Sequence, residues 1–301
     1  PKFQSPFQYT RMTAKAMRQA LIDQKGWKSE ELPCEKTIGN ILNRLGYRLR
    51  RVQKAKPVKK VRETDAIFEN VQRENQASDE RKDSLRISID TKDKVKVGDL
   101  SRGGQSRGAE ATKANDHDMQ YKEKLVPFGI LDVLGCVLSI IFGMSRETSD
   151  FIADCLQQWW DANASQYAHI RQLVINLDNG PNNSGFRTQF LKRMVEFADR
   201  NGLEIVLVYY PPYHSKYNPI ERCWGILEAH WSGALLNCRT TTLEWARTMT
   251  WNGIHPVVEL LDSVYEKGVK IAKKAFQSIE KRLKRNDAIP KYSVRIEPRL
   301  T

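Results

Sequence analysis

Two nearly continuous apolar runs constrain the fold of this chain more than any other feature. Residues 173–177 and 205–210 are almost wholly apolar, and the first run ends at Asp178. Runs of this kind are typical of strands buried on both faces, as in a parallel sheet covered by helices. Apolar side chains recur at helical spacing between the two runs: Phe186, Phe190, Met194 and Phe197. The sequence therefore predicts a strand–helix–strand unit.

The same pattern continues upstream. Apolar and polar side chains alternate over residues 85–89, as in a half-buried strand, and Asp90 follows directly. Three more strands and a helix are expected, over residues 94–97, 128–133, 136–142 and 148–160. This order of elements is that of an α/β domain. We predict a mixed sheet flanked by helices over residues 85–263.

The charge of the chain is distributed unevenly. Lys and Arg number 49 and Asp and Glu number 36, which gives a net charge of +13. Residues 1–60 carry +11, residues 61–263 carry −5 and residues 264–301 carry +7. Between Arg44 and Lys60 there are eight basic residues and no acid. That density suits a polyanion, because each neutralised phosphate releases counterions, whereas an acidic middle is expected where clustered carboxylates hold divalent metal.

Composition argues against two classes of protein. No apolar run approaches the length needed to cross a bilayer, so we expect no membrane partner. The five cysteines are odd in number and include no C-x-x-C pair, which indicates reduced thiols in the cytoplasm and not a disulfide framework or a zinc knuckle. The chain begins at Pro1 without an initiator Met, and we expect a trimmed fragment with further DNA-binding sequence upstream.

Residues 1–56 have the pattern of a small, all-α winged helix-turn-helix domain. Thr13 can cap a helix over residues 14–24, a second amphipathic helix follows, and residues 47–51 alternate as in a ribbon. The second helix would enter a major groove and the basic arm would follow the backbone. The side chains expected to bind DNA are Lys36, Thr37, Asn40, Asn43, Arg44, Arg48, Arg50, Arg51 and Lys54. The alternative is a small helical bundle with a charged face.

Two further segments flank the expected sheet. Residues 57–84 are expected to be a linker that contains a helix over residues 63–74. Residues 264–301 are basic and are expected to form a helix or tail, with apolar residues at near-helical spacing: Ile271, Phe276, Ile279 and Leu283. This pattern fits an amphipathic helix on DNA or on a partner subunit as well as a simple surface helix.

Three carboxylates are expected to meet at one edge of the sheet. Asp90 and Asp178 follow strands at their carboxyl ends, where open α/β sheets gather ligands, and Glu221 lies in the first turn of a helix. Carboxylate oxygens suit Mg²⁺ or Mn²⁺. Two such ions can promote an in-line phosphoryl displacement without a nucleophilic side chain. Four other acids compete with these three, of which Asp132 is the strongest rival: Asp93, Asp99, Asp132 and Glu147.

Four polar residues are expected near these carboxylates: His117, His214, Lys216 and Asn218. For His117, which lies between two aspartates, a role at the metal site and a structural role are equally open. His214 and Lys216 precede the helix of Glu221 and are suited to contact phosphate or the scissile strand. A hydrogen bond within the loop is the alternative for both.

Three segments carry a resemblance to a known family: ISIDTK at residues 87–92, INLDNG at 175–180 and HSKYNPIER at 214–222. They resemble DDE transposases of bacterial insertion sequences, most closely the Rhodopirellula-type DDE transposases. These are relatives of the mariner-like enzymes within the RNase H-like and retroviral integrase superfamily. Further motifs agree, at residues 96–99, 115–118, 126–129, 159–160 and 211–212, so the match covers most of residues 85–271.

The resemblance implies an RNase H-like domain whose catalytic and metal-binding triad is Asp90, Asp178 and Glu221, with two Mg²⁺ or Mn²⁺ ions. It also implies cleavage at transposon ends and joining of the freed 3′-hydroxyl to target DNA. Double-stranded DNA is the expected partner, and a homodimer or higher oligomer is expected because two ends must be paired. The expected location is the bacterial cytoplasm, at the nucleoid. Two alternatives stay open: a related nuclease that cuts without joining, and a catalytically silent, domesticated DNA-binding regulator.

Overall fold

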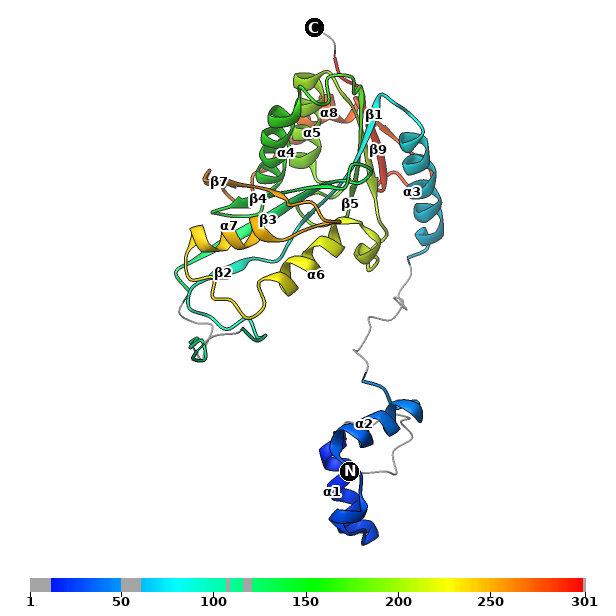
Figure 1. Ribbon diagram of the computed structural model, residues 1–301. Helices are drawn as coiled ribbons and strands as arrows, with labels where there is room; N and C mark the ends of the chain where they lie inside the picture. Colours follow the sequence, from blue (N-terminus) through cyan, green and yellow to red (C-terminus); the bar gives the residue numbers. More distant parts are fainter. Residues whose placement is uncertain (1–11, 50–60, 107–108, 116–120, 300–301) are drawn as a thin grey trace. The chain divides into compact units, whose positions relative to one another are not determined.

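The chain folds into two compact units, residues 1–56 and residues 57–301. This computed structural model describes residues 12–49, 61–106, 109–115 and 121–299 (Figure 1). Four of the residues proposed from the sequence lie outside the described ranges: Arg50, Arg51, Lys54 and His117.

The N-terminal unit contains two packed helices. Helix α1 (Ala14–Lys25) begins where the Thr13 hydroxyl accepts a hydrogen bond from the amide of Ala16 at 3.0 Å. This bond satisfies one of the amides that a helix leaves without a partner in its first turn. A 3-10 turn, η1 (Ser29–Glu31), leads to helix α2 (Glu35–Arg44). The predicted cap at Thr13 is confirmed.

Helix α2 turns a polar face to solvent. Ile38 is its buried residue, whereas the side chains predicted to reach DNA are exposed on the helix: Lys36, Thr37, Asn40, Asn43 and Arg44. Arg48, just beyond the helix, is exposed as well. The ribbon expected over residues 47–51 has no strand in its described part, residues 47–49. The winged form of the motif is therefore not confirmed.

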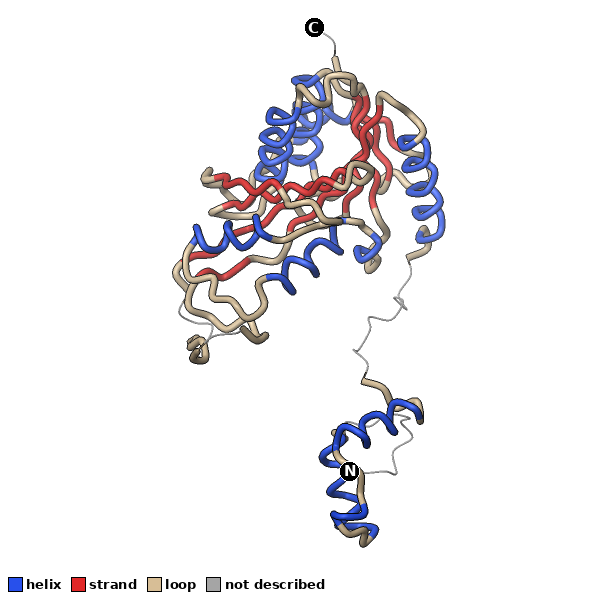
Figure 2. The backbone as a smooth tube through the Cα atoms, in the orientation of Figure 1, coloured by secondary structure: helices blue, strands red, loops and turns tan. Residues whose placement is uncertain are grey.

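A nine-stranded mixed sheet forms the centre of the second unit, as Figure 2 shows in red. The order across the sheet is β7-β4-β3-β1-β5-β6-β9-β8, and β2 pairs with β3. Strands β1, β5 and β6 are parallel, whereas β3 is antiparallel to both β1 and β4. The strands are β1 (Ser84–Thr91), β2 (Val95–Val97), β3 (Glu123–Asp132), β4 (Val137–Gly143), β5 (Gln172–Leu177), β6 (Glu204–Tyr209), β7 (Val257–Leu261), β8 (Leu283–Arg285) and β9 (Ser293–Ile296). The predicted mixed α/β fold is confirmed.

Helices cover both faces of this sheet (Figure 1). One face carries α4 (Ser149–Asn163), α5 (Thr188–Asn201) and α8 (Lys273–Glu280), packed against the largest apolar core. The other face carries α6 (Ile220–His230) and α7 (Arg239–Thr248) over a second core. Because β5 is covered on both sides, all six of its residues are buried, as its apolar sequence predicts.

Helix α3 (Thr64–Asp79) belongs to the second unit. The helix expected within the linker at residues 57–84 therefore exists, but it packs against the sheet. Its Ile67 and Val71 join a buried cluster with Val174 of β5 and Val206 of β6. Buried apolar area stabilises this contact by about 25 cal/mol per Å², so α3 is fixed to the fold.

The C-terminal segment differs from the expected helix or tail. It contains the short helix α8, but β9 then pairs antiparallel with β6, with Leu207 opposite Val294. Val294 and Ile296 are buried while Arg295 between them is half-buried, and β9 lies between β6 and the last strand of the sheet, β8. The physical reason for the difference is that β6 would otherwise present an open row of amides and carbonyls.

No helix among the described residues is both long and apolar enough to cross a membrane.

Candidate active site

Asp90 lies in β1 beside the sheet's second core. Its carboxylate oxygen Oδ2 accepts a hydrogen bond from the indole Nε1 of Trp224 in α6 at 2.8 Å. Burial, together with the negative charges of Asp178 and Glu221, raises the pKa of Asp90 to about 8. These three acids therefore lie close enough to interact electrostatically. That these three acids form a catalytic, metal-binding triad stays a prediction.

Asp178 follows β5, the strand next to β1. Its Oδ1 accepts a hydrogen bond from the Asn183 side-chain amide at 2.8 Å and a longer one from the Gly180 amide at 3.3 Å. The carbonyl of Asn183 accepts a hydrogen bond from the hydroxyl of Tyr209, a fully buried residue of β6, at 2.8 Å. The carboxylate is thus oriented by a loop that is anchored to the core.

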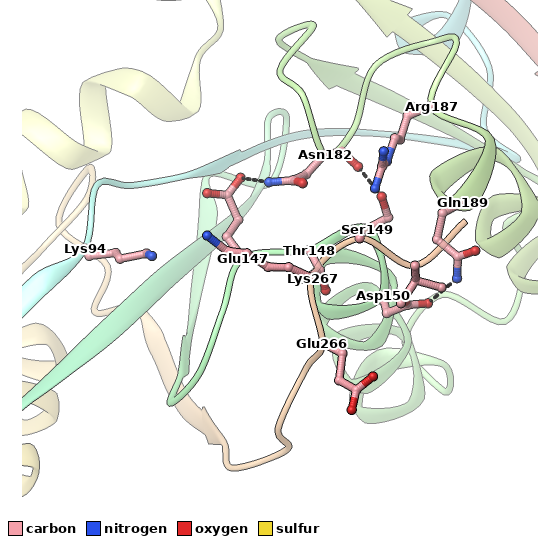
Figure 3. Close-up of a pocket in the computed structure, with 12 residues that line it drawn as sticks. Lys94, Glu147, Thr148, Ser149, Asp150, Asn182, Arg187, Gln189, Glu266 and Lys267 are labelled. Carbon is pink, nitrogen blue, oxygen red and sulfur yellow. Dashed lines mark hydrogen bonds between the residues drawn. The ribbon is translucent and has the colours of Figure 1, made fainter. Parts of the chain in front are cut away.

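A second set of contacts holds the same loop to the start of α4. The Asn182 side-chain amide donates to Glu147 Oε1 at 3.1 Å, and the Ser149 hydroxyl donates to the Asn182 carbonyl at 2.7 Å (Figure 3). These residues line a cavity of about 270 Å³ that also includes Lys94 and Arg187. The competing acid Glu147 therefore lies in the wall of this cavity and fastens the loop of Asp178.

Glu221 is brought to the sheet by a buried polar clamp at the start of α6. Asn218, which has no exposed surface, accepts a hydrogen bond from the Ser88 hydroxyl at 2.6 Å and donates to the Ile89 carbonyl at 3.0 Å. The amide of Ile220 in turn donates to Ser88 Oγ at 3.0 Å. The clamp thus ties the first turn of α6, which carries Glu221, to the residues of β1 immediately before Asp90.

His214 and Lys216 have different surroundings from Asn218. The ring of His214 is buried, its Nδ1 lies 2.7 Å from the Pro212 carbonyl, and it meets Phe68 of α3 edge to face at 5.4 Å. Lys216 Nζ lies 5.2 Å from the centre of the Tyr217 ring. His214 thus makes a hydrogen bond within its loop, and a contact of His214 or Lys216 with phosphate stays a prediction.

Asp132, the strongest rival to the triad, is at the other end of the β1–β3 pair. Asp132 is opposite Ile87 in the register, whereas Asp90 is opposite Gly129. The carboxylate of Asp132 accepts hydrogen bonds from the Gly135 amide at 2.8 Å and from the Tyr167 hydroxyl at 3.1 Å. Its surroundings are those of a buried turn residue, with both oxygens engaged by structural donors.

The donor set at this edge fits a hard divalent cation. Within the described ranges, no three His, Cys, Asp or Glu side chains are already arranged to hold a metal ion. Three carboxylates nevertheless interact there, and Asn183 Oδ1 is buried with no hydrogen-bond partner among the described residues. Mg²⁺ and Mn²⁺ prefer oxygen ligands such as carboxylates. A side-chain amide oxygen can bind such an ion or accept a hydrogen bond from a water bound to it.

Three residues of the site were not singled out as functional from the sequence. Trp224 was expected to be core, and it is buried, but its indole also fixes Asp90. Ser88 occupies a polar position of the alternating strand, a signal that it faces away from the first core and toward α6. Asn183 lies five residues after Asp178, in a loop where only the tertiary structure reveals the partner of each amide.

Comparison with known proteins gives a family match and a set of distant structural likenesses. The family described as Rhodopirellula transposase DDE domain matches residues 1–298. No curated protein matches the chain. Among solved structures, the chain is similar to the Mos1 mariner paired-end complex with Mn (12% identity, TM-score 0.46, 80% of this chain and 72% of that one). It is also similar to the Mos1 transposase paired-end complex with left transposon end (11%, 0.44, 80% and 71%) and to the Mos1 strand transfer complex (12%, 0.44, 80% and 70%). The family match spans nearly the whole sequence, including all three carboxylates, and the chain belongs to the family of Rhodopirellula transposase DDE domains.

Proposed function

We propose that this transposase cuts DNA at the ends of its element and joins the freed 3′-hydroxyl to target DNA, with Asp90, Asp178 and Glu221 as the metal-binding triad. The observation that carries the proposal is the pKa of Asp90, raised to about 8 by burial and by two neighbouring carboxylates. Unpaired like charges held together at a sheet edge cost stability, and a bound cation offsets that cost.

The chain's own residues would prepare this site in three ways. Trp224 and Asn183 orient the carboxylates of Asp90 and Asp178 through single hydrogen bonds. The Asn218–Ser88 clamp fixes the start of α6, and with it Glu221, to β1. When bound, a pair of Mg²⁺ or Mn²⁺ ions would activate the attacking oxygen and stabilise the leaving one.

Two successive displacements at phosphorus make up the proposed reaction. In the first, water attacks a phosphodiester at the element's end, and the bond from phosphorus to the 3′-oxygen breaks to give a 3′-hydroxyl and a 5′-phosphate. In the second, that hydroxyl attacks a target phosphodiester and displaces a 3′-oxygen of the target strand. The number of phosphodiester bonds is unchanged in the second step, so it needs no energy source.

DNA recognition is assigned in this proposal to the N-terminal unit as a winged helix-turn-helix. The exposed face of α2, with Lys36, Asn40 and Arg44, is of the kind that reads a major groove. Two element ends must be handled together, so we propose that the protein works as a homodimer or larger assembly on DNA. Such a substrate would bring the protein to the bacterial nucleoid.

The test is divalent-metal-dependent cleavage of a labelled duplex that carries the element's own end. Wild type is compared with Asp178→Asn and with Asp93→Asn, which removes one exposed carboxylate three residues after Asp90. We expect cleavage by wild type and Asp93→Asn, none by Asp178→Asn, and equal DNA binding by all three. Specific binding without cleavage by any of them would refute the enzyme and favour the silent regulator.

Joining is tested separately on ends that are already cut. The duplex presents a free 3′-hydroxyl, and a supercoiled plasmid serves as target. Strand transfer by wild type in Mg²⁺ supports the full transposase. Cleavage of uncut ends without any transfer of cut ends would instead identify the nuclease that cuts but does not join.

A further inference from the structure

Arg187 differs from the other half-buried arginines of the second unit because its side chain has no partner. Arg86 forms an ion pair with Asp79 at 2.7 Å, and Arg193 forms one with Asp150 at 2.8 Å. In the part of the chain that the structure describes, the guanidinium group of Arg187 makes neither a hydrogen bond nor an ion pair, and its Nε is buried. A partly desolvated cation is therefore held in the fold without a partner among the described residues.

The place of Arg187 in the fold makes this positive charge costly. Helix α5 begins at the next residue, Thr188, and its first turn contains no acid. The amide groups at the start of a helix carry partial positive charge, so a cation there is unfavourable and an anion is favoured. A charged group that loses water without gaining a partner lowers stability as well. An anion bound between Arg187 and the start of α5 would remove both costs.

Arg187 lines the cavity of about 270 Å³ beside the loop of Asp178. The wall of this cavity also contains Ser149 and Asp150, the first two residues of α4. In Figure 3, Arg187 extends from the start of α5 toward the start of α4. The exposed Lys94 and Lys267 lie in the same wall. The cavity thus gathers three basic side chains and the starts of two helices.

Three acids line the cavity as well, but none of them neutralises Arg187. Asp150 forms an ion pair with Arg193 at 2.8 Å, and Glu147 accepts a hydrogen bond from an asparagine amide of the loop at 3.1 Å. Glu266 is exposed to solvent, where salt screens its charge. Within the described ranges no ion pair joins any of the three to Arg187, so its guanidinium group is available to a ligand.

One loop joins this cavity to the candidate active site. The Asn183 side-chain amide donates to Asp178 at 2.8 Å, and the carbonyl of the preceding Asn182 accepts from the Ser149 hydroxyl in the cavity wall at 2.7 Å. The backbone that orients a triad carboxylate is therefore also the backbone that forms the cavity. A ligand that reaches both places carries anionic groups in series, as a nucleic-acid strand does.

We infer that Arg187 binds a phosphate of the DNA strand on which the triad acts, one that flanks the phosphate under attack, and thereby positions that strand. A planar guanidinium group donates two parallel hydrogen bonds to a phosphate, which an ammonium group does not. This inference rests on the proposed function for the identity of the ligand as DNA. The shared chemistry is a phosphodiester, and the strand belongs either to the element's end or to the target.

The experiment combines the removal of one protein charge with the removal of one DNA charge. Neutral methylphosphonates replace single phosphates around the cleavage position of an end duplex, and the affinity of the full chain is measured in EDTA so that no cleavage occurs. Wild type is compared with Arg187→Gln, with Arg187→Lys and with the control Arg200→Gln. Arg200 lies in the last turn of the same helix, where it is exposed and paired with Asp161.

A phosphate of the element's end gives a definite pattern in this first arm. Neutralising one or two adjacent phosphates should weaken binding by wild type and by Arg200→Gln about tenfold, because a hydrogen bond between charged groups is lost. Arg187→Gln should bind the unmodified duplex about tenfold more weakly, and the same methylphosphonates should then have no further effect. Arg187→Lys should be intermediate, since it keeps the charge without the planar geometry.

A second arm tests the target strand. Complexes assembled on unmodified cut ends are titrated with a target duplex over a range of salt. A slope of log K against log salt that is lower by about 0.9 for Arg187→Gln than for Arg200→Gln, in this arm alone, assigns the phosphate to the target. Arg187→Gln that matches Arg200→Gln in both arms overturns the inference.

Thermal unfolding without DNA separates phosphate binding from a structural role. Removing a cation that has no partner should leave the Tm of Arg187→Gln at or above that of wild type. A Tm that falls in Arg187→Gln and not in Arg200→Gln, together with methylphosphonate losses equal to those of wild type, would identify Arg187 as a structural residue and overturn the inference.

The outcome is distinguishable from that of the proposed function. Wild type that makes the phosphate contact through Arg187 but never cleaves in Mg²⁺ would keep the phosphate site and refute the enzyme. Wild type that cleaves and joins, while Arg187→Gln behaves like Arg200→Gln in both arms, would keep the enzyme and refute the phosphate site.

Discussion

The raised pKa of Asp90 makes a definite prediction about stability in the absence of metal. In the folded protein this carboxyl takes up its proton near pH 8, whereas an aspartate of ordinary pKa does so near 3.8. The folded state therefore binds one more proton than the unfolded state between these values. Protons favour folding in that window, so the contribution to the free energy of unfolding is lost as pH rises from about 4 to about 8.

The size of the effect follows from linkage. A difference of one bound proton corresponds to about 1.4 kcal/mol per pH unit. Between pH 6 and pH 8, both inside the window, wild type should lose about 3 kcal/mol from this residue at most. Asp90→Asn keeps an oxygen to accept the bond from Trp224 but cannot ionise, so its free energy of unfolding should be correspondingly less dependent on pH.

The assay is urea unfolding of the full chain in EDTA, followed by tryptophan fluorescence at pH 6, 7 and 8. Asp93→Asn serves as the control, because it removes an exposed carboxylate just beyond the end of β1, three residues after Asp90. Wild type and Asp93→Asn should show the same decline with pH, and Asp90→Asn a smaller one. Parallel curves for all three proteins would refute the argument that burial beside Asp178 and Glu221 raises the pKa of Asp90.

Three further outcomes are expected. Asn218→Ala should lower the free energy of unfolding by about 2–4 kcal/mol in urea titrations, because it removes two buried hydrogen bonds and leaves Ser88 without an acceptor; a loss below 0.5 kcal/mol would contradict the clamp. Gly129→Ala should abolish cleavage while Gly225→Ala, on an exposed helix position with open space, does not, since a methyl at Gly129 would lie 2.6 Å from the Trp224 ring that holds Asp90. Mg²⁺ at a hundred times its dissociation constant should stabilise wild type by about 2.7 kcal/mol, as seen by calorimetry; an equal rise for Asp178→Asn would mean that the ion binds elsewhere.

The centre of the sheet could be predicted from the sequence because β5 and β6 are buried on both faces. A nearly continuous apolar run such as residues 173–177 predicts a strand that is covered on both faces. Asp178 follows the run directly and marks the carboxyl end of β5. The register then brings Asp90 and Asp178 to neighbouring strands. The place of each acid at the end of its strand thus follows from local pattern, whereas their adjacency depends on the pairing of β1 with β5.

The parts that escaped prediction depend on contacts between distant segments. The strand β9 has four residues, too few for a periodic signal, and it exists because β6 offers an open edge. The bond from Trp224 to Asp90 spans 134 positions, and Trp224 in the sequence is indistinguishable from its apolar neighbours in α6. For the proposed ribbon, described residues 47–49 form no strand, because no partner segment pairs with them there.

The late position of β9 in the chain has a consequence for synthesis. Strand β6 is made about 85 residues before β9, and until residues 293–296 emerge from the ribosome its outer edge has no partner. An uncovered edge recruits other extended chains, so the nascent protein passes through an aggregation-prone interval. Pairing across so long a separation is also slow, because loop closure precedes any gain from contact. We therefore expect nascent chains interrupted before residue 293 to be cleared by proteases and not to accumulate as shortened, DNA-cutting forms.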